Sequence, residues 1–534
     1  MIRHAELPAE QASIFPQSLD GVLFDMDGVI TDTAKAHAAV WKQVFDEYLK
    51  ERADREGEEF QPFDSRREYR QYVDGKPRYD GVKSFLESRG IELPHGNEGD
   101  GPGRETVCGL GNRKNQYFQG WLTQNRVRTY PGTLALIRAL RQASIKIAAF
   151  SASRNADTVL RQAGVLELFD VVFDGRNLAE FGLPGKPDPA MLLKTALRLG
   201  VPPGRAAVLE DAIAGVEAGV AGGFGLVIGI ARGDGHDDLK KAGAHLVVHD
   251  ASELMLSGGK QLTVKTLVDL PSVWDCEEHI RRRVSGKALA VFLDYDGTLT
   301  PIVEDHTRAW LSGDMRAAVA ELGKCCTVVI VSGRDLTMLR GLVELDSVGY
   351  AGSHGFEIVS PEGSTVSLER GLEFLPELDQ VEEELRKRLA GIKGHAIERK
   401  RFSIALHYRQ VADKDTGQLK PILDRVLADH PRLCRGYGKK VFEIKPDIDW
   451  NKGNAVLWLL ERLGLDGQEV LPLYIGDDIT DEDAFHVLAG RGLTIVVRDH
   501  ETRQTAADFA VTDTKDVKRL LEMLSSMVNE TKGG

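Results

Sequence analysis

Short, nearly continuous apolar runs alternate along the chain with longer segments in which apolar residues recur every three or four positions. The runs are typical of strands buried on both faces of a parallel sheet, and the longer segments are typical of amphipathic helices. The apolar runs lie at residues 21–31, 145–153, 170–175, 206–212, 225–230, 289–300, 327–334 and 472–478, and helical segments lie at residues 131–143, 155–163 and 190–199. This alternation predicts doubly wound parallel sheets of the α/β class.

One short motif occurs twice, as GVLFDMDGVIT at Gly21–Thr31 and as LAVFLDYDGTLT at Leu289–Thr300. Each copy is an apolar run that ends in Asp-x-Asp-Gly, and the glycine allows a sharp turn after the acids. Both carboxylates are therefore expected at the carboxyl end of a buried strand, where open α/β sheets bind their ligands. The repeat predicts two tandem domains, with a boundary near residues 250–285.

Length and composition fit this division. The chain has 534 residues, of which 42% are hydrophobic, and 534 residues are enough for two large domains. The net charge of −13 argues against nucleic acid or an anionic membrane as the main partner, because both require clustered positive charge. The five cysteines are scattered and form no CxxC pair, which excludes a disulfide framework and a zinc site.

Nothing in the sequence predicts secretion or membrane insertion. The first residues, MIRHAELPAEQ, lack the apolar core of a signal peptide. The longest apolar stretch, Ala218–Ala231, has 14 residues and is too short to cross a bilayer. We therefore expect a cytoplasmic protein.

The second half carries four polar motifs in order. They are DYDGTLT at Asp294–Thr300, VSGR at Val331–Arg334, NKG at Asn451–Gly453 and IGDDITDED at Ile475–Asp483. Because the ends of parallel strands meet at one edge of a sheet, this order should gather Asp294, Asp296 and Asp477 in one site, with Asp478 and Asp481 close by.

Such a cluster of acids requires a cation. Two unit charges 4 Å apart repel by about 4 kcal/mol at an effective dielectric constant near 20. Oxygen ligands completed by water and phosphate favour Mg²⁺ over zinc. One carboxylate can then attack phosphorus, and a second can protonate the leaving alcohol. Ser332 can hydrogen-bond the phosphate, and Lys452 can neutralise it.

These motifs resemble those of the haloacid-dehalogenase superfamily of phosphotransferases. The resemblance implies that Asp294 is the nucleophile, that Asp296 is the acid and base, and that Ser332 and Lys452 bind phosphate. It also implies that Asp477 binds the metal, and we expect Asp294 and Asp296 to belong to the same Mg²⁺ site.

More specifically, the second half resembles trehalose-6-phosphate phosphatase over residues 286–525. The resemblance rests on LDYDGTLTPI, VSGRD, AGSHGFEI, IERKRFSIALHYR, VFEIKP, NKGNAV and YIGDDITDED. It implies an α/β cap domain inserted between Ser332 and Lys452. The implied contacts to the sugar or its phosphate are Glu398, Lys400, His407, Glu443 and Lys445, with His354 on a nearby loop. Glu398 and Lys400 are alternatively a surface ion pair, since they share one face of a strand.

The first half repeats the chemistry with other residues. Its acids are Asp25 and Asp27, and the later motifs FSASRN, GKPDP and VLEDAIAG supply the remaining candidates. Ser151 and Lys186 are the candidate phosphate ligands. The candidate Mg²⁺ ligands are Asp25, Asp27, Glu210 and Asp211, although Glu210 is alternatively an acid that holds the ligands in place without binding the metal itself.

Over residues 18–235 this half resembles β-phosphoglucomutase and its relatives. The likeness includes Thr33, His37 and Trp41 of DMDGVITDTAKAHAAVW, and Ser153 and Asn155 of the SASRN loop. It implies a Rossmann-like domain with a helical cap at about residues 34–125. It also implies that the cap residue Arg78 holds the non-reacting phosphate.

The cap departs from that family at two places. Asp74 stands where the family has a lysine, and Lys76 lies two residues further on. The polar, glycine-rich segment His95–Glu105 is expected to be a flexible loop. These departures leave open whether the first domain is a mutase or a phosphatase.

The sequence therefore predicts two haloacid-dehalogenase domains, at residues 18–250 and 286–525, joined by a linker at residues 251–285. The predicted activity is Mg²⁺-dependent hydrolysis of trehalose 6-phosphate by the second domain, while the first acts on a hexose phosphate. The alternatives are a different sugar phosphate for the second domain, such as a sucrose or glucosylglycerol phosphate, and a non-catalytic first domain that senses sugar phosphates. Small sugar phosphates are the expected partners, and the oligomeric state is not predicted.

Overall fold

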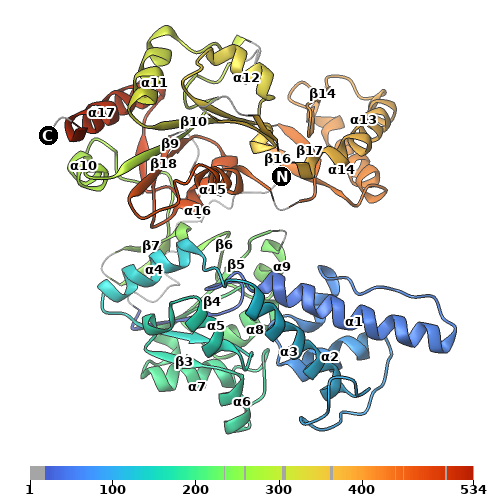
Figure 1. Ribbon diagram of the computed structural model, residues 1–534. Helices are drawn as coiled ribbons and strands as arrows, with labels where there is room; N and C mark the ends of the chain where they lie inside the picture. The colour runs from blue at the N-terminus through green and yellow to red at the C-terminus, as the bar shows by residue number, and fades with distance from the viewer. Residues whose placement is uncertain are drawn as a thin grey trace. The chain divides into compact units, whose positions relative to one another are not determined.

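The computed structural model of the chain divides into two compact units, Met1–Lys265 and Thr266–Gly534 (Figure 1). The residues that it describes are 19–233, 235–257, 260–303, 308–360, 365–367, 369–438, 440–448, 450–498 and 502–532. The N-terminal residues for which a signal peptide was considered lie outside these ranges. Along the described part of the chain, no helix is both long enough and apolar enough to cross a membrane.

The first unit is built on a six-stranded parallel sheet with the strand order β3-β2-β1-β4-β5-β6. The strands are β1 (Gly21–Asp25), β2 (Lys146–Phe150), β3 (Val171–Phe173), β4 (Ala206–Glu210), β5 (Leu226–Ile230) and β6 (Leu246–Val248). The chain reverses its winding direction between β1 and β4. The carboxyl ends of these two neighbouring strands therefore flank the crevice in which such sheets bind ligands.

Helices cover both faces of this sheet, because successive residues of each strand face opposite sides and both sides are apolar. On one face Val22 and Phe24 pack in a cluster with Ile137 of α4, and on the other Leu23 packs in a cluster with Met191 of α7. The helices are α4 (Pro131–Gln142), α5 (Ala156–Gln162), α6 (Gly175–Phe181), α7 (Ala190–Leu199), α8 (Ile213–Ala221) and α9 (His236–Lys241).

A helical cap is inserted after β1. It consists of α1 (Ala34–Glu56), the π-helix η2 (Tyr69–Val73), α2 (Arg78–Ser88) and α3 (Val107–Gln124). Figure 1 shows these helices gathered beside the sheet of this unit. The cap has an apolar core of its own, in which Trp41, Phe45 and Phe85 are fully or almost fully buried.

The segment that the sequence analysis treats as a linker is folded. Its first part forms a hairpin of β7 (Leu254–Ser257) and β8 (Gln261–Val264), whose Leu254 and Leu262 pack into the core of the first unit. Its second part contributes Leu267 and Val273 to the cores of the second unit. Helix α10 (Glu277–Val284) then precedes the second sheet.

The second unit has an eight-stranded sheet with the order β13-β12-β11-β10-β9-β18-β19-β20. The strands are β9 (Ala288–Asp294), β10 (Thr327–Val331), β11 (Gly349–Gly352), β12 (Glu357–Val359), β13 (Thr365–Ser367), β18 (Val470–Gly476), β19 (Leu493–Val497) and β20 (Phe509–Val511). The six strands from β11 to β20 are parallel, and β12 and β13 are antiparallel edge strands. The helices beside this sheet are α11 (Gly313–Cys325), α12 (Leu336–Val343), α15 (Lys452–Arg462), α16 (Glu482–Leu488) and α17 (Thr514–Lys532).

A second cap is inserted between β13 and α15. It combines a four-stranded antiparallel sheet of order β14-β15-β17-β16 with two helices. Its elements are α13 (Leu375–Leu389), β14 (Ala396–Arg399), β15 (Ile404–His407), α14 (Asp413–Ala428), β16 (Leu433–Gly438) and β17 (Val441–Pro446). Figure 1 shows this α/β cap as a separate layer beside the main sheet of its unit.

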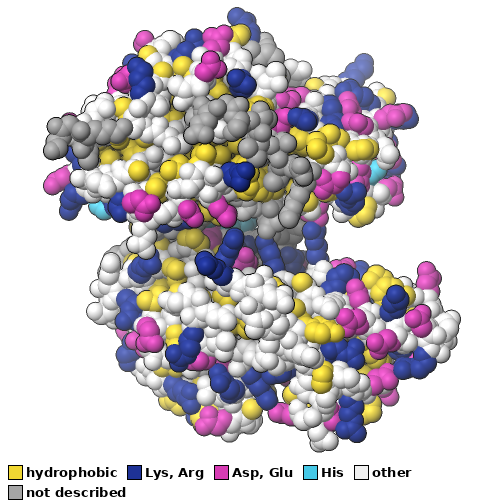
Figure 2. Space-filling view, viewed as in Figure 1, with side chains coloured by type: hydrophobic (Ala, Val, Ile, Leu, Met, Phe, Trp, Pro, Cys, Tyr) yellow, Lys and Arg dark blue, Asp and Glu magenta, His cyan; other side chains and the backbone are white. Residues whose placement is uncertain are grey.

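The α/β class and the parallel sheets predicted from the sequence are confirmed. Each expected strand overlaps an observed strand, for example residues 145–153 with β2 and residues 472–478 with β18. The segment His95–Glu105 contains neither helix nor strand, as expected for a loop. On the face shown in Figure 2, acidic and basic side chains are interspersed over the cap helices of the first unit.

Candidate active sites

The motifs of the second half meet at the carboxyl edge of the second sheet. Asp294 ends β9, which lies between β10 and β18, and its partner in the register is Val331, directly before Ser332. Asp477 directly follows β18. Lys452 begins α15, because the preceding Asn451 caps that helix by accepting a hydrogen bond from the backbone N–H of Asn454.

A buried lysine joins two buried acids in this site. Lys452 donates to Oδ1 of Asp294 at 2.6 Å and to Oδ1 of Asp481 at 2.7 Å, and it is 3% exposed. Burial raises the pKa of Asp294 well above its usual value, the nearby Asp481 raises it further, and Lys452 opposes both effects. Asp481 also accepts hydrogen bonds from Tyr474 and from the backbone N–H groups of residues 477 and 478, which fixes the acidic loop.

The side chains of Asp294, Asp477 and Asp481 can hold a metal ion. One carboxylate oxygen from each lies within 4.8 Å of the other two, and all three residues are buried. The loop after β9 leaves room for Asp477 only because Gly297 has no side chain. A Cβ there would lie 2.1 Å from Oδ2 of Asp477, and the φ of +85° also favours glycine. Carboxylate oxygens at this spacing fit Mg²⁺.

Asp296 is oriented away from this group. Both of its oxygens accept hydrogen bonds from Arg334, at 2.6 Å from Nε and 2.5 Å from Nη2. Its side chain is 40% exposed, whereas that of Asp294 is 6% exposed. The carboxylate of Asp296 is therefore not among the three that the structure brings together for a metal.

The cap residues predicted to contact sugar fall into two groups. In the first, Glu443 of β17 accepts a hydrogen bond from Ser403 at 2.8 Å and lies 3.6 Å from His354 of the main domain and 4.0 Å from Lys400. Burial alone raises the pKa of Glu443, but His354 and Lys400 lower it far below its usual value. Lys445, on the same strand, acts electrostatically on Asp483 of the main domain.

In the second group, Glu398 of β14 pairs with His407 of β15 at 2.9 Å. The His407 side chain is 46% exposed. The structure therefore brings Lys400, Glu443 and Lys445 toward the main domain, whereas Glu398 and His407 pair with each other.

The first unit repeats the arrangement at the ends of β1 and β4. Lys186 donates to Oδ1 of Asp25 at 2.6 Å and also to Glu210, and all three residues are buried. Oxygens of Asp25, Glu210 and Asp211 lie within 4.8 Å of one another. A Cβ at Gly28, whose φ is +86°, would lie 1.7 Å from Oδ2 of Asp211, so this loop too requires glycine.

Glu210 corresponds in role to Asp481 of the second unit. One of its oxygens accepts from Lys186, and the other accepts from the backbone N–H of Ala212 at 3.0 Å. These bonds favour the alternative in which Glu210 holds Lys186 and the loop in place without itself binding the metal, while Asp211 remains the candidate metal ligand.

Asp27 faces inward, unlike Asp296. It accepts hydrogen bonds from Thr33 and from Ser151, the latter at 3.2 Å, and Nε2 of His37 lies 3.4 Å away. Burial raises the pKa of Asp27, but His37 and Thr33 outweigh it and bring the pKa to about 2. Behind His37, the ammonium of Lys114 lies 2.6 Å from Nδ1, and burial lowers the pKa of Lys114 to about 7.

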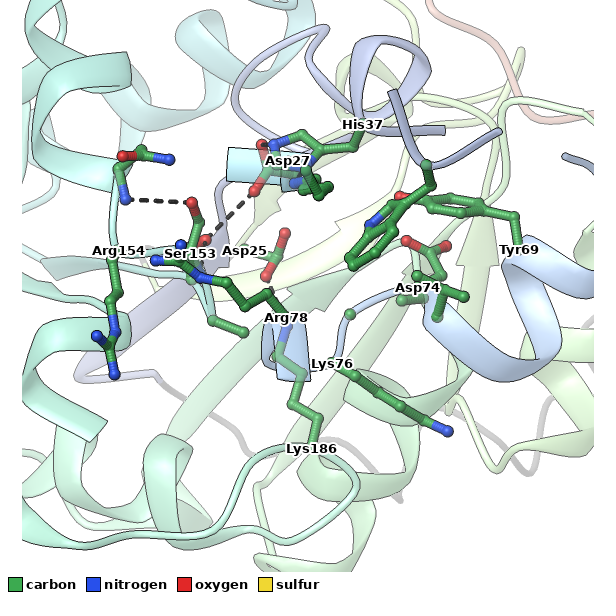
Figure 3. Close-up of a pocket in the computed structure, with 18 of the residues that line it drawn as sticks. Asp25, Asp27, His37, Tyr69, Asp74, Lys76, Arg78, Ser153, Arg154 and Lys186 are labelled. Atoms are coloured by element: carbon green, nitrogen blue, oxygen red, sulfur yellow. Dashed lines mark hydrogen bonds and ion pairs between the residues drawn. The ribbon is translucent and has the colours of Figure 1, made fainter. Parts of the chain in front are cut away.

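These groups line a cavity of about 70 Å³ between the cap and the main domain of the first unit (Figure 3). Ser153 and Asn155 of the SASRN loop form one wall, where the backbone N–H of Asn155 donates to Ser153. Arg78 reaches the cavity from the cap. Lys76 also lines it, but its ammonium donates to Ser84 of the cap at 2.8 Å.

The sequence motifs assign no role to Arg334 or Lys114, nor to Tyr69, which lines the cavity of the first unit. Arg334 belongs to the VSGR motif, so the sequence places it near Ser332, the candidate phosphate ligand, but it does not indicate that Asp296 is its partner. Lys114 and Tyr69 lie in helices that carry no local signal of their contacts.

Two family models match the chain. One described as trehalose-phosphatase matches residues 292–515, and one described as haloacid dehalogenase-like hydrolase matches residues 19–223. These matches confirm the resemblance that the sequence motifs indicated for each half.

Individual proteins match as well. A trehalose-phosphate phosphatase of Mycobacterium tuberculosis is 38% identical over 336 residues, which are 62% of this chain and 84% of that protein. An uncharacterized glycosyl hydrolase of the same species is 38% identical over 517 residues, which are 96% of this chain and 38% of that protein. The chain thus spans well under half the length of this second relative. A solved β-phosphoglucomutase from Clostridium difficile is 27% identical and aligns over 44% of this chain and 92% of its own, with a TM-score of 0.35.

Proposed function

Because the chain belongs to the trehalose-phosphate phosphatase family, we propose that its second unit hydrolyses trehalose 6-phosphate to trehalose and phosphate. The observation that carries the proposal is the meeting of Asp294, Lys452 and Asp477 at one sheet edge. The cap above it contacts the main domain through Glu443, which lies near His354, and through Lys400, which donates to the carbonyl of Gly333. The functional domains in this proposal are residues 18–250 and 286–525.

Asp294 is the nucleophile. Its Oδ2 attacks phosphorus while Oδ1 is held by Lys452, which neutralises charge on the carboxylate and on the phosphoryl oxygens. Ser332, which is buried and directly follows Val331, the register partner of Asp294, donates to a phosphoryl oxygen. The bond between phosphorus and the sugar oxygen breaks, and an aspartyl-phosphate is formed.

Asp296 is the acid and base. It protonates the leaving sugar oxygen and then removes a proton from the water that hydrolyses the aspartyl-phosphate. Both of its oxygens accept from Arg334 in the structure, and each keeps a second lone pair that is available to the sugar oxygen or to water.

Mg²⁺ is the proposed cofactor of both units. When bound by Asp294 and Asp477, it screens the phosphate from the carboxylates and stabilises charge on the transferring group. The pair Asp25 and Asp211 would hold the corresponding ion in the first unit. We expect chelation of divalent ions to abolish phosphate release and added Mg²⁺ to restore it, measured with inorganic-phosphate detection. Full activity after exhaustive chelation would contradict the metal assignment.

The substrate and the nucleophile are tested together by phosphate release from trehalose 6-phosphate. We expect Asp294→Asn to reduce kcat by at least about a thousandfold, because the amide oxygen is a poor nucleophile. The matched control is Asp25→Asn, which makes the same change in the first unit and should leave this activity intact. Substantial activity in Asp294→Asn would reject the mechanism, and a preference for another sugar phosphate would reject the substrate.

For the first unit, we propose a second phosphotransferase site that acts on a hexose phosphate, with Asp25 as nucleophile and Asp27 as acid and base. The inward orientation of Asp27, held by Thr33 and Ser151, supports a competent site. Isomerisation between β-glucose 1-phosphate and glucose 6-phosphate and plain hydrolysis are the two candidate reactions. Assay of both in a chain carrying Asp294→Asn tests the site, and loss of the activity in the added Asp25→Asn variant assigns it.

A further inference from the structure

A carboxylate of the cap faces the core acids of the first unit. The π-helix η2 ends at Val73, and the backbone N–H of the following Asp74 donates to the carbonyl of Tyr69, five residues earlier, at 2.9 Å. The next residue, Gly75, packs so closely on the main domain that a Cβ there would lie 3.0 Å from that of Ala212. π-Helical turns are rare in proteins, and those that occur are often found at functional sites. Here the π-turn places Asp74 at the face of the cap that meets the main domain.

Asp74 belongs to the same cavity as the proposed nucleophile. It lines the cavity together with Asp25 and Asp211, and Figure 3 shows it beside Tyr69. Burial and then the charge of Glu210 raise the pKa of Asp74 to about 6, while the hydrogen bond from Tyr69 opposes this shift. The cap thus adds a hydrogen-bond acceptor to a cavity that already contains several carboxylates.

A second cap carboxylate neutralises a cation at the opposite wall. Glu98, in the loop between α2 and α3, accepts two hydrogen bonds from Arg154 of the SASRN loop, at 2.9 and 2.8 Å. Arg154 lines the cavity, and its guanidinium would otherwise be available to an anionic ligand. The Glu98 side chain is 60% exposed, so solvent weakens this pair.

Five basic side chains line the cavity of the first unit, and their partners affect how strongly it attracts an anion. Four of the five are engaged by protein groups: Lys186 by Asp25 and Glu210, Lys114 by His37, Lys76 by Ser84 and Arg154 by Glu98. Within the described ranges of the chain, Arg78 has no carboxylate at ion-pair distance. Ser84 and His37 are uncharged partners, so Lys76 and protonated Lys114 keep their positive charge. Glu98, in contrast, cancels the charge of Arg154, and Asp74 adds a negative charge to the cavity. These two carboxylates therefore weaken the attraction of the cavity for a second phosphoryl group.

We propose that Asp74 and Glu98 restrict the first unit to sugars with a single phosphate, so that it hydrolyses a hexose monophosphate and does not isomerise it. The inference rests on the proposed function of the first unit as an active phosphotransferase. A mutase must transfer the phosphoryl group from Asp25 to a second hydroxyl and keep the resulting bisphosphate bound while it turns over. A hydroxyl group donates a hydrogen bond to Asp74, whereas a second phosphate would be repelled by it.

The hydrolytic step needs only water. Water attacks the phosphorus of phosphorylated Asp25, the bond between phosphorus and the carboxylate oxygen breaks, and the water proton passes to Asp27. Asp25 is regenerated and inorganic phosphate leaves.

The first test uses the full chain with Asp294→Asn, which silences the second unit. With Mg²⁺, β-glucose 1-phosphate and glucose 6-phosphate are each supplied, with and without glucose 1,6-bisphosphate, and both phosphate release and isomerisation are measured. We expect phosphate release without isomerisation, and inhibition by the bisphosphate only above the KM of the monophosphate. Isomerisation faster than phosphate release would overturn the proposal.

The second test removes each cap charge in that background. Asp74→Asn should lower the inhibition constant of glucose 1,6-bisphosphate, relative to the KM of the monophosphate, by about tenfold, which corresponds to about 1.4 kcal/mol. Glu98→Gln should lower it by about threefold, because its charge is more exposed. Glu105→Gln, which removes an exposed charge of the same loop paired with Arg55, should leave it unchanged. Equal effects of all three variants would contradict the proposal.

A binding measurement separates this inference from the activity itself. If the first unit neither hydrolyses nor isomerises either sugar, its proposed function fails. Calorimetric titration of the chain carrying Asp25→Asn and Asp294→Asn with monophosphate and with bisphosphate then tests the charge argument alone. Weaker binding of the bisphosphate supports it, and equal or tighter binding overturns it.

Discussion

At the scale of single residues, both units depend on a buried lysine held between two acids. Lys452 lies between Asp294 and Asp481, and Lys186 holds Asp25 in the same way. Removing one member of such a set leaves a buried charge without compensation, which destabilises a protein strongly. We therefore expect loss of Asp481 or Glu210, the second acid of each set, to destabilise the site by leaving the lysine with one acid partner fewer.

The burial of Lys114 destabilises the folded first unit by an amount that depends on pH. Its pKa falls from 10.5 to about 7 because burial disfavours the charged form. Between these values the unfolded chain binds a proton that the folded chain does not, so this group makes folding more favourable as pH rises. Lys114→Met should therefore raise the stability of the first unit by a few kcal/mol at pH 6, and by much less near pH 10.

Thermal unfolding of the variant and the wild-type chain at both pH values checks this. Lys83→Met is the matched control, since Lys83 is 62% exposed on α2 and should show no such trend. A gain in melting temperature for Lys114→Met that is equal at pH 6 and pH 10 would contradict the assignment.

At the scale of elements, the loops after β1 and β9 bring acids from neighbouring strands together. Gly297→Ala would place a Cβ 2.1 Å from Asp477 and move that carboxylate. We expect a loss of phosphatase activity of about a hundredfold, since a displacement near 1 Å has effects of that size. Gly286→Ala is the control for backbone strain, because Gly286 also has a positive φ, of +72°, but nothing lies near its Cβ.

The measurement is kcat/KM of both variants with the same sugar phosphate. Comparable losses in Gly297→Ala and Gly286→Ala would show that backbone strain, and not the contact with Asp477, decides the effect.

The strands and their terminal motifs were predictable, whereas several partners of the site residues were not. Apolar runs and the Asp-x-Asp-Gly turn are local signals, so Asp25 and Asp294 were placed at strand ends from the sequence. The pairing of Arg334 with Asp296 depends on side-chain direction at the sheet edge, which spacing does not encode. The loop carrying Glu98 was predicted only as a loop, and its bond to Arg154 depends on how the cap meets the main domain.

At the scale of the molecule, each hydrophobic core lies within one unit. The cluster of buried side chains that contains Phe24 has all its described members in the first unit, and the cluster that contains Phe292 has all of its described members in the second.

We therefore expect two calorimetric unfolding transitions, one for each unit. Phe24→Ala should lower the free energy of unfolding of the first unit, and Phe292→Ala that of the second, each by about 3–5 kcal/mol, because both rings are fully buried. A shift of both transitions by either variant would contradict separate unfolding.

The sequence by itself determined the fold class, the two copies of the domain and the acids at the strand ends, because these depend on local periodicity and on motifs that stand directly after a strand. Only the tertiary structure decided that Asp27 faces inward while Asp296 is held by Arg334, and that the cap places Asp74 and Glu98 around the first cavity. Those contacts join residues that are far apart along the chain. They follow from the packing of each cap on its own sheet, for which no local pattern exists.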